Sequence, residues 1–308
     1  MSFSPVKIKN KTKQKEVMPV KKGTLFYEHN GLQLWEGDAR NLDFIPDDSV
    51  QLIVTSPPYN VAMDYKEWND TLSVDDYLEF TRQWIKECYR ILCVGGRLAV
   101  NVPAALTQST ESKIAFVAMD IWNIAVKEIG FLPRDWIIWN KPYSLQGVTS
   151  WGSWLSQSSP FCRDKAEFII VFSKKQYNLD PRGKQSDLTK DEFLQLTKNV
   201  WTMAPESRKL HPAPFPLELP LRIIKLYSFP DDLVVDPFVG SGTTLLACKL
   251  LKRRGIGVDY NPDYLKISKE RISQQTLPFK DVILTKFKFL EEDDLPNKLE
   301  FTQLELLK

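Results

Sequence analysis

The chain has 308 residues, of which 43% are hydrophobic and 26% charged, and its formal net charge is +2 at pH 7. This size supports a real hydrophobic core and one large α/β domain, with room for a small accessory lobe. No stretch approaches the roughly 18 apolar residues of a membrane span, and the lysine-rich start lacks the apolar run of a signal peptide. We therefore expect a cytoplasmic protein without a membrane partner.

The cysteine and histidine content argues against a zinc site. The four cysteines form no Cys-x-x-Cys pair, and His29 and His211 are the only histidines in the sequence. These ligands are too few and too widely spaced for a structural zinc ion. We expect no bound metal, and we interpret the cysteines as reduced packing residues.

Residues 1–22 carry lysines at seven positions against the single acid Glu16. Such a charge run is typical of a solvated, flexible arm. The alternative is an arm that touches phosphate groups.

Residues 23–141 alternate between strand-like and helix-like patterns. The apolar run 51–54 stops at two prolines, which favours a buried parallel strand. Over 75–92 the apolar residues recur at helical spacing, and Gly95-Gly96 ends that pattern. In chain order we expect strands over 32–35, 51–54, 97–102 and 135–140, and helices over 75–92 and 113–129.

The segment 142–210 has a different character. It is rich in serine, glycine and tryptophan, and its periodicity is weak. We expect long loops with one short helix near 190–198 and one returning strand at 168–172. Loops of this length without regular structure usually have a function in a compact domain.

Alternation resumes over 211–275, followed by a charged tail at 276–308. We expect helices over 217–228, 243–253 and 262–274, and strands over 233–236 and 255–259. Strands that alternate with helices predict a doubly wound, mainly parallel α/β sheet.

A glycine-rich turn, Asp236-Pro-Phe-Val-Gly240-Ser-Gly242-Thr-Thr244, lies where a strand should pass into a helix. It has neither the lysine of a phosphate loop nor the third glycine of a dinucleotide fingerprint. Asp259 ends the next strand about 20 residues later, where a carboxylate accepts hydrogen bonds from a ribose. The pattern predicts a nucleoside without a pyrophosphate, such as S-adenosylmethionine, with Asp236 at its ammonium group. The alternative is a turn that merely joins strand to helix.

A second turn, Thr55-Ser56-Pro57-Pro58-Tyr59-Asn60, follows the strand at 51–54. Two prolines make it stiff and remove two backbone donors. The Ser56 hydroxyl and the Pro57 carbonyl can then accept both hydrogens of an exocyclic amino group. Tyr59 offers a flat surface for a base that has left the helix. The alternative is a plain Pro-Pro turn.

The two turns resemble those of the amino-methylating DNA methyltransferases, and their order, catalytic turn first, resembles the β group of that family. The resemblance covers about residues 24–274 and includes Gly37-Asp38-Ala39 and His211-Pro-Ala-Pro-Phe215-Pro216. It implies a mixed seven-stranded sheet with helices on both faces, in which strand 233–236 is central although it comes late. It implies S-adenosylmethionine as cofactor and catalysis by Ser56, Pro57, Pro58 and Tyr59. The cofactor-binding residues it implies are Asp38, Ala39, Phe215, Asp236, Phe238, Gly240, Ser241, Gly242, Thr243 and Asp259.

By the same resemblance, 23–141 is the catalytic half, 142–210 the target-recognition region and 211–275 the cofactor-binding half. Duplex DNA is the expected partner, with a restriction endonuclease for the same site and a homodimer as further partners. The expected DNA contacts use cationic and aromatic side chains suited to phosphates and bases. They are Lys141, Trp151, Trp154, Arg163, Lys174 and Lys175.

The target atom follows from what the turn contains. Transfer to cytosine C5 needs a thiolate, usually in a Pro-Cys pair, and the sequence has none. In the family that the turns resemble, the Ser-Pro-Pro-Tyr form goes mostly with cytosine N4 and the Asp form mostly with adenine N6. We expect cytosine N4. Adenine N6 is the alternative, and a non-catalytic DNA-binding subunit with the same fold is the second.

Overall fold

A computed structural model describes residues 19–60, 72–103, 106–107, 114–115, 117–141, 153, 155–160, 166–206 and 215–274. Most of the predicted arm and the predicted tail lie outside these residues. So do Trp151, Trp154 and Arg163, together with the start of the segment that contains Phe215.

In the described part of the chain, nine strands form one mixed sheet in the order β1-β2-β11-β10-β3-β4-β8-β7-β9. Strands β2, β11, β10, β3 and β4 run parallel, while β8 is antiparallel to β4 and β7 is antiparallel to β8. The strands are β1 (Thr24–His29), β2 (Leu32–Glu36), β3 (Val50–Thr55), β4 (Leu92–Pro103), β7 (Leu132–Asn140), β8 (Ala166–Ser173), β9 (Val200–Thr202), β10 (Leu233–Asp236) and β11 (Arg254–Asp259). A separate hairpin pairs β5 (Leu106–Thr107) with β6 (Ile114–Ala115).

The predicted seven-stranded arrangement is the central part of this sheet, from β2 to β7. Strand β10 lies between β11 and β3, so the late strand is central, as expected. The two outer strands were not predicted from the sequence. β1 pairs with β2 as a hairpin, and the three-residue β9 adds to the far edge next to β7.

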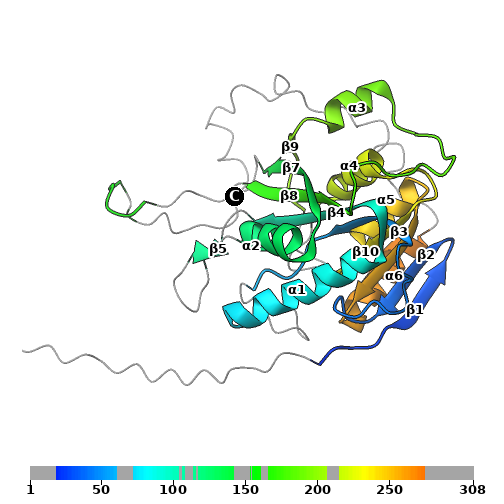
Figure 1. Cartoon of the computed structure of the whole chain (residues 1–308), viewed down its shortest axis with the longest axis horizontal. Coiled ribbons are helices and arrows are strands. Elements are labelled where there is room, and N and C mark those ends of the chain that lie inside the picture. Colours follow the sequence, from blue (N-terminus) through cyan, green and yellow to red (C-terminus); the bar gives the residue numbers. More distant parts are fainter. Residues whose placement is uncertain are drawn as a thin grey trace, which may run out of the picture.

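Helices cover both faces of the sheet, and the central strands are buried on both sides because of it (Figure 1). In β3, Ile53 belongs to one apolar cluster whereas Leu52 and Val54 belong to the other. This alternation is the pleat of a strand that is buried on both faces. The helices are α1 (Val74–Ile91), α2 (Val117–Asn123), the π-helix η1 (Ile124–Ile129), α3 (Lys190–Leu196), α4 (Glu218–Tyr227), α5 (Thr243–Leu250) and α6 (Pro262–Ser273).

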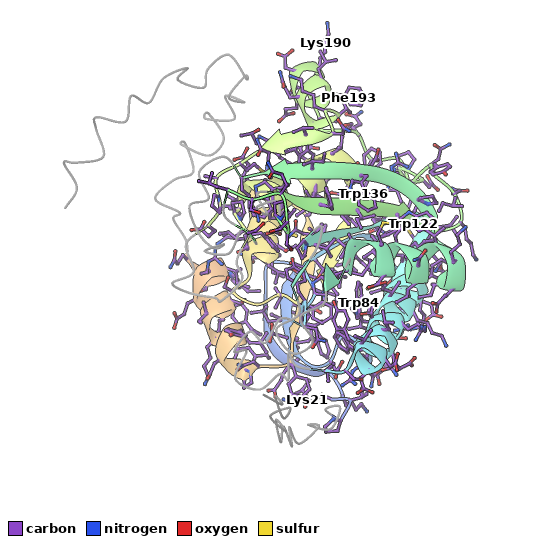
Figure 2. All side chains as sticks on the ribbon, turned by 90° about the vertical axis from the view of Figure 1, so that its left-hand side faces the viewer. Lys21, Trp84, Trp122, Trp136, Lys190 and Phe193 are labelled. Atoms are coloured by element: carbon purple, nitrogen blue, oxygen red, sulfur yellow. The ribbon has the colours of Figure 1, made fainter. Side chains whose placement is uncertain are left out.

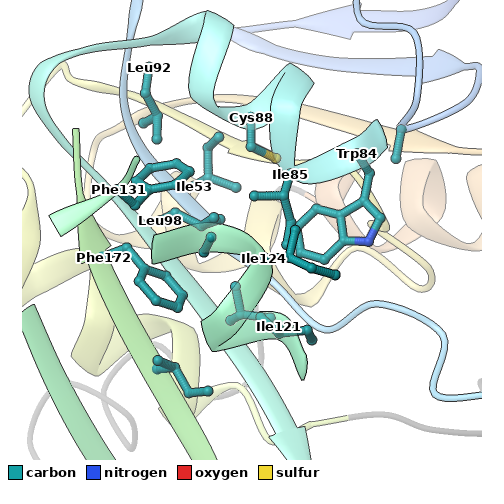
Figure 3. Packing of buried hydrophobic residues seen from close by; sticks show 14 of the residues in the cluster. Ile53, Trp84, Ile85, Cys88, Leu92, Leu98, Ile121, Ile124, Phe131 and Phe172 are labelled. Atoms are coloured by element: carbon teal, nitrogen blue, oxygen red, sulfur yellow. The ribbon is translucent and has the colours of Figure 1, made fainter. Parts of the chain in front are cut away.

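Helices α1, α2 and η1 pack against the first face. Trp84 and Cys88 of α1 meet Ile53 and Leu98 of the sheet there, and all four side chains are fully buried (Figure 3). α1 begins at Ser73, whose hydroxyl accepts a hydrogen bond from the backbone N–H of Asp76. The opposite face is covered by α4, α5 and α6, whose apolar residues form the second cluster.

One predicted element needs correction. The expected helix over 113–129 is β6 followed by α2 and η1, and it ends at Gly130 with a positive φ of 94°. In the described part of 142–210, the predicted strand is β8, the predicted short helix is α3, and β9 is an addition. α3 has a complete capping box between Thr189 and Glu192 and projects from the molecule together with Phe193, which is 52% exposed (Figure 2). Among the described residues, no helix is long and apolar enough to cross a membrane.

Candidate active site

The two predicted turns meet at the carboxyl edge of the parallel strands. The glycine turn follows β10, the Pro-Pro-Tyr turn follows β3, and these strands are paired neighbours. Asp259 ends β11, on the other side of β10. Loops that follow adjacent parallel strands enclose the crevice where open α/β sheets bind ligands.

The glycine turn is held from behind by α6. Ser268 Oγ donates to the carbonyl of Gly240 at 2.8 Å, and Arg271 Nη1 donates to the carbonyl of Ser241 at 2.6 Å. Gly242 has φ 82°, and a Cβ there would lie 2.6 Å from Ser268 Oγ. Only glycine therefore fits this position without strain.

Helix α5 starts directly after this turn, with Gly242 as its N-cap and no side chain capping it. Its first backbone N–H groups carry the positive end of the helix dipole. This end of α5 suits the carboxylate of an amino-acid ligand.

Asp236, the last residue of β10, lies between the two turns, and it is 1% exposed. Its carboxylate accepts hydrogen bonds from Thr55 Oγ1 at 2.8 Å, Thr244 Oγ1 at 2.6 Å and the backbone N–H of Phe238 at 3.1 Å. No cation of the described residues forms an ion pair with it. Burial, partly offset by these hydrogen bonds, raises the pKa of Asp236 to about 6. A ligand ammonium group would supply the missing positive charge.

The acids predicted for the ribose and adenine are differently engaged. Asp259 accepts from the backbone N–H groups of Gly240 and Asn261, both at 2.9 Å, so it ties β11 to the glycine turn. Asp38 forms an ion pair of 2.6 Å with Arg40, and both side chains are 3% exposed. An adenine contact at Asp38 has to share this carboxylate with Arg40, and the adenine role stays a prediction.

The remaining predicted cofactor residues lie in or beside these turns, except for Phe215. The ring of Phe238 packs edge-on against Trp84 at 5.7 Å, so it also anchors the turn to α1. Ser241 and Thr243 are buried within the turn, and Ala39 is buried beside Asp38. Phe215 is half-buried against the second apolar cluster, on the side of α4.

The Pro-Pro-Tyr turn contains the two predicted acceptors, the Ser56 hydroxyl and the Pro57 carbonyl. Ser56 Oγ lies 2.5 Å from Tyr59 Oη, which also donates to the carbonyl of Asn101 at 3.0 Å. The carbonyl of Pro58 accepts from Tyr77 Oη at 2.9 Å. Among the described residues, the carbonyl of Pro57 has no donor. The half-buried Ser56 and this carbonyl are therefore the acceptors that the turn offers.

A family model for DNA methylases of the N6/N4 type matches residues 50–270. The chain belongs to this family. It is 39% identical over 180 residues to the type II methyltransferase M.MjaVI of Methanocaldococcus jannaschii, covering 58% of this chain and 89% of that protein. It is 32% identical over 240 residues to the type II methyltransferase M.HpaI of Haemophilus parainfluenzae, covering 75% of this chain and 70% of that protein.

A solved structure has the same fold. It is a Thermus thermophilus protein assigned as a DNA modification methylase, in complex with S-adenosyl-L-methionine, with 30% identity and a TM-score of 0.60. The comparison covers 77% of this chain and 92% of that one. The expected family and fold are thereby confirmed, and S-adenosylmethionine is supported as the methyl donor of this methylase.

The predicted DNA contacts divide into two groups. Lys141 follows β7 at the carboxyl edge, where it forms an ion pair of 2.8 Å with Glu167. Lys174 follows β8 at the opposite end of the strands, where the parallel strands begin, and is 4% exposed. Its ammonium group donates to Asp48 and to the backbone carbonyls of Arg90 and Leu92. This placement corrects the prediction that Lys174 contacts DNA, because the ammonium group is enclosed and far along the sheet from both turns. Lys175 is exposed at that same distant edge.

Several residues that shape the site were missed by the sequence analysis. Thr55 and Thr244 hold Asp236, Ser268 and Arg271 hold the glycine turn, and Asn101 contacts Tyr59. The threonines flank recognised motifs and could have been found from that position. The others are 28 to 42 residues away from the groups they contact and have no local signal.

Proposed function

We propose that this methylase transfers a methyl group from S-adenosylmethionine to the N4 amino group of a cytosine rotated out of duplex DNA. The observation that carries the proposal is the contact between the two turns. Thr55, which precedes Ser56, donates to Asp236 across 2.8 Å. An amino group held at Ser56 would share one crevice with a cofactor whose ammonium group meets Asp236.

The chemistry asks the chain to hold and orient a weak nucleophile. Bound S-adenosylmethionine supplies an electrophilic methyl group. Ser56 Oγ and the Pro57 carbonyl accept the two hydrogens of the amino group, which directs its lone pair toward that methyl carbon. The nitrogen–carbon bond forms as the carbon–sulfur bond breaks, and the electron pair of that bond stays on sulfur. The nitrogen then loses one proton to water.

Tyr59 has two tasks in this proposal. Its ring is the surface on which the extruded base stacks, which offsets part of the cost of leaving the helix. Its hydroxyl donates its single proton to the Asn101 carbonyl, so the Ser56 hydroxyl must donate to Tyr59 Oη. The lone pairs of Ser56 are then available to the amino group.

The choice of cytosine depends on Ser56 at the head of the turn, and adenine N6 is the alternative. To test it, DNA treated with the protein and S-adenosylmethionine is digested to nucleosides and analysed by mass spectrometry. We expect N4-methylcytosine. Detection of N6-methyladenine alone would replace cytosine by adenine. Cofactor and DNA binding without any methylated base would favour the non-catalytic subunit.

The curated relatives support a proposal for the biological role of this methylase. M.MjaVI and M.HpaI are type II methyltransferases, and we propose that this methylase likewise protects a site cut by a partner endonuclease. We further propose that 142–210 contacts the target sequence. Methylation-sensitive sequencing of DNA from cells that express the chain would identify that sequence. Sedimentation would test the expected homodimer.

A further inference from the structure

A chain of polar contacts extends from the catalytic turn to the far side of β8. Asn101, near the end of β4, donates through Nδ2 to Tyr59 Oη at 3.3 Å and to Glu167 Oε2 at 2.6 Å. Glu167 Oε1 accepts from Lys141 Nζ at 2.8 Å. These residues adjoin because Glu167 of β8 pairs with Pro103 of β4 on one side and Trp139 of β7 on the other.

The carboxylate decides which way the Asn101 amide faces. An ionised carboxylate only accepts hydrogen bonds, so the NH₂ group of Asn101 must face Glu167. The same NH₂ group then faces Tyr59 Oη. With its lone pairs facing this donor, the Tyr59 hydroxyl directs its own proton to the Asn101 carbonyl.

This arrangement leaves one atom unsatisfied. Asn101 is 3% exposed, and its Oδ1 has no hydrogen-bond partner among the described residues. A buried acceptor without a donor is a net cost to the fold. The orientation of this amide is therefore better explained by what it does for Tyr59 than by stability.

Both members of the ion pair are largely buried, with 13% of the Lys141 side chain and 18% of the Glu167 side chain exposed. Lys141 also lies 5.4 Å from the centre of the Trp139 ring. Its ammonium group is thus held against the domain, where it pairs with Glu167.

We infer that Glu167 and Lys141 are positioning residues for methyl transfer: they orient Asn101, and through Tyr59 they keep the lone pairs of Ser56 turned toward the target amino group. The inference rests on the proposed function and gives Lys141 a role other than the predicted phosphate contact. The two residues that would orient the catalytic turn thus lie on β8 and directly after β7, next to the expected target-recognition region.

The test compares Glu167→Ala, Glu167→Gln and Lys141→Met with the wild-type protein. Single-turnover transfer of a labelled methyl group is followed on unmethylated plasmid DNA, with saturating cofactor and DNA. Glu167→Ala should slow transfer by about 10-fold to 100-fold. Glu167→Gln keeps an acceptor for Asn101 and should recover most of the rate. Affinity for S-adenosylmethionine should be the same in all variants.

Lys141→Met separates positioning from DNA binding. We expect a slower transfer step at saturating DNA, with an unchanged salt dependence of DNA affinity. A normal rate with weaker binding and a shallower salt dependence would make Lys141 a phosphate contact and overturn its positioning role. Lys86→Met, at an exposed position on α1 that belongs to neither turn, is the matched control and should change neither quantity.

A wild-type rate in Glu167→Ala would overturn the inference for Glu167. So would a loss that Gln does not rescue and that follows a lower unfolding temperature. A further readout needs no substrate: exchange of the Asn101 side-chain amide protons, measured by NMR on the protein alone. Slow exchange that becomes fast in Glu167→Ala supports the inference even if the wild type methylates no DNA, and equal exchange contradicts it.

Discussion

The two ends of β10 carry acids that are equally buried but differently compensated. Asp232 and Asp236 are both 1% exposed. At the amino edge, Asp232 accepts from Lys184 at 2.8 Å and from Arg182 at 3.0 Å, so cations of the chain itself neutralise it. At the carboxyl edge, Asp236 has only hydroxyl and backbone donors among the described residues.

The contrast extends to the surroundings of these acids. The amino edge also contains Lys174, whose ammonium group is satisfied by Asp48 and two backbone carbonyls. The buried charges there, Asp232 and Lys174, thus have partners within the described fold. At the carboxyl ends, the buried Asp236 has no counter-charge among the described residues, and this is expensive unless a ligand supplies one. We therefore assign stability to one edge and ligand binding to the other.

Neutralising each acid in turn tests the difference between the two ends of β10. Asp236→Asn should weaken binding of S-adenosylmethionine by roughly 100-fold to 1000-fold, because it removes the partner of a desolvated ammonium group. It should leave the free energy of unfolding of the free protein unchanged or higher, since a buried uncompensated charge is lost. Calorimetry measures the affinity and thermal unfolding the stability.

Asp232→Asn is the matched control and should behave in the opposite way. It removes the counter-charge of two partly exposed cations, so it should lower the free energy of unfolding by about 1 to 2 kcal/mol without changing cofactor affinity. Equal cofactor affinity in wild type and Asp236→Asn would show that the ammonium group lies elsewhere.

The next largest effect is expected at Tyr59. Loss of the ring in Tyr59→Ala should slow methyl transfer by roughly 10-fold to 200-fold, because stacking of the extruded base is lost. From the sequence alone, Tyr59→Phe should retain much of the activity. The contacts of Tyr59 with Ser56 and Asn101 revise that expectation to a loss of about 10-fold. Cofactor affinity should not change in either variant, and equal turnover of Ala and wild type would remove Tyr59 from the mechanism.

Cofactor binding should also depend on pH in a defined direction. The pKa of Asp236 is raised from its usual 3.8 to about 6, so the acid is protonated below pH 6 in the free protein. Affinity for the cationic cofactor should then fall by about 10-fold per pH unit below 6. The stability of the free protein should change in the opposite direction. Between pH 3.8 and 6 the folded state binds more protons than the unfolded state, because the pKa of Asp236 is raised on folding. The contribution of Asp236 to the free energy of unfolding therefore decreases as the pH rises through that window. A cofactor affinity that is flat between pH 7 and 5 would contradict the assignment.

The smallest expected effect separates backbone strain from crowding in the glycine turn. Gly242 and Gly183 have similar positive φ angles of 82° and 75°. A Cβ would collide with Ser268 at Gly242 but would meet nothing within 4 Å at Gly183. Gly242→Ala should therefore lower the free energy of unfolding by about 1 kcal/mol more than Gly183→Ala. Equal losses in thermal unfolding would mean that Ser268 moves aside.

Much of the fold could be read from local patterns. The central strands were predicted because both their faces are apolar, and their alternation between two clusters explains why β3 and β10 read as short continuous apolar runs. The two motifs also placed Ser56 and Asp236 at the carboxyl ends of strands that proved to be neighbours. The outer strands were missed because β9 has three residues and β1, whose side chains are exposed or half-buried, does not alternate between apolar and polar residues.

What the sequence determined by itself is the chemistry available at each turn: two stiff prolines, two glycines and an acid after a buried strand. Tertiary structure decided which charges are satisfied. The partners of Asp232 are 48 and 50 residues away, and Lys174 reaches Asp48 across 126 residues. A lysine looks the same in sequence whether it neutralises a buried acid or faces solvent. The desolvation that distinguishes these cases arises only when distant strands are brought together, and it assigns Lys174 to the fold and leaves Asp236 for a ligand.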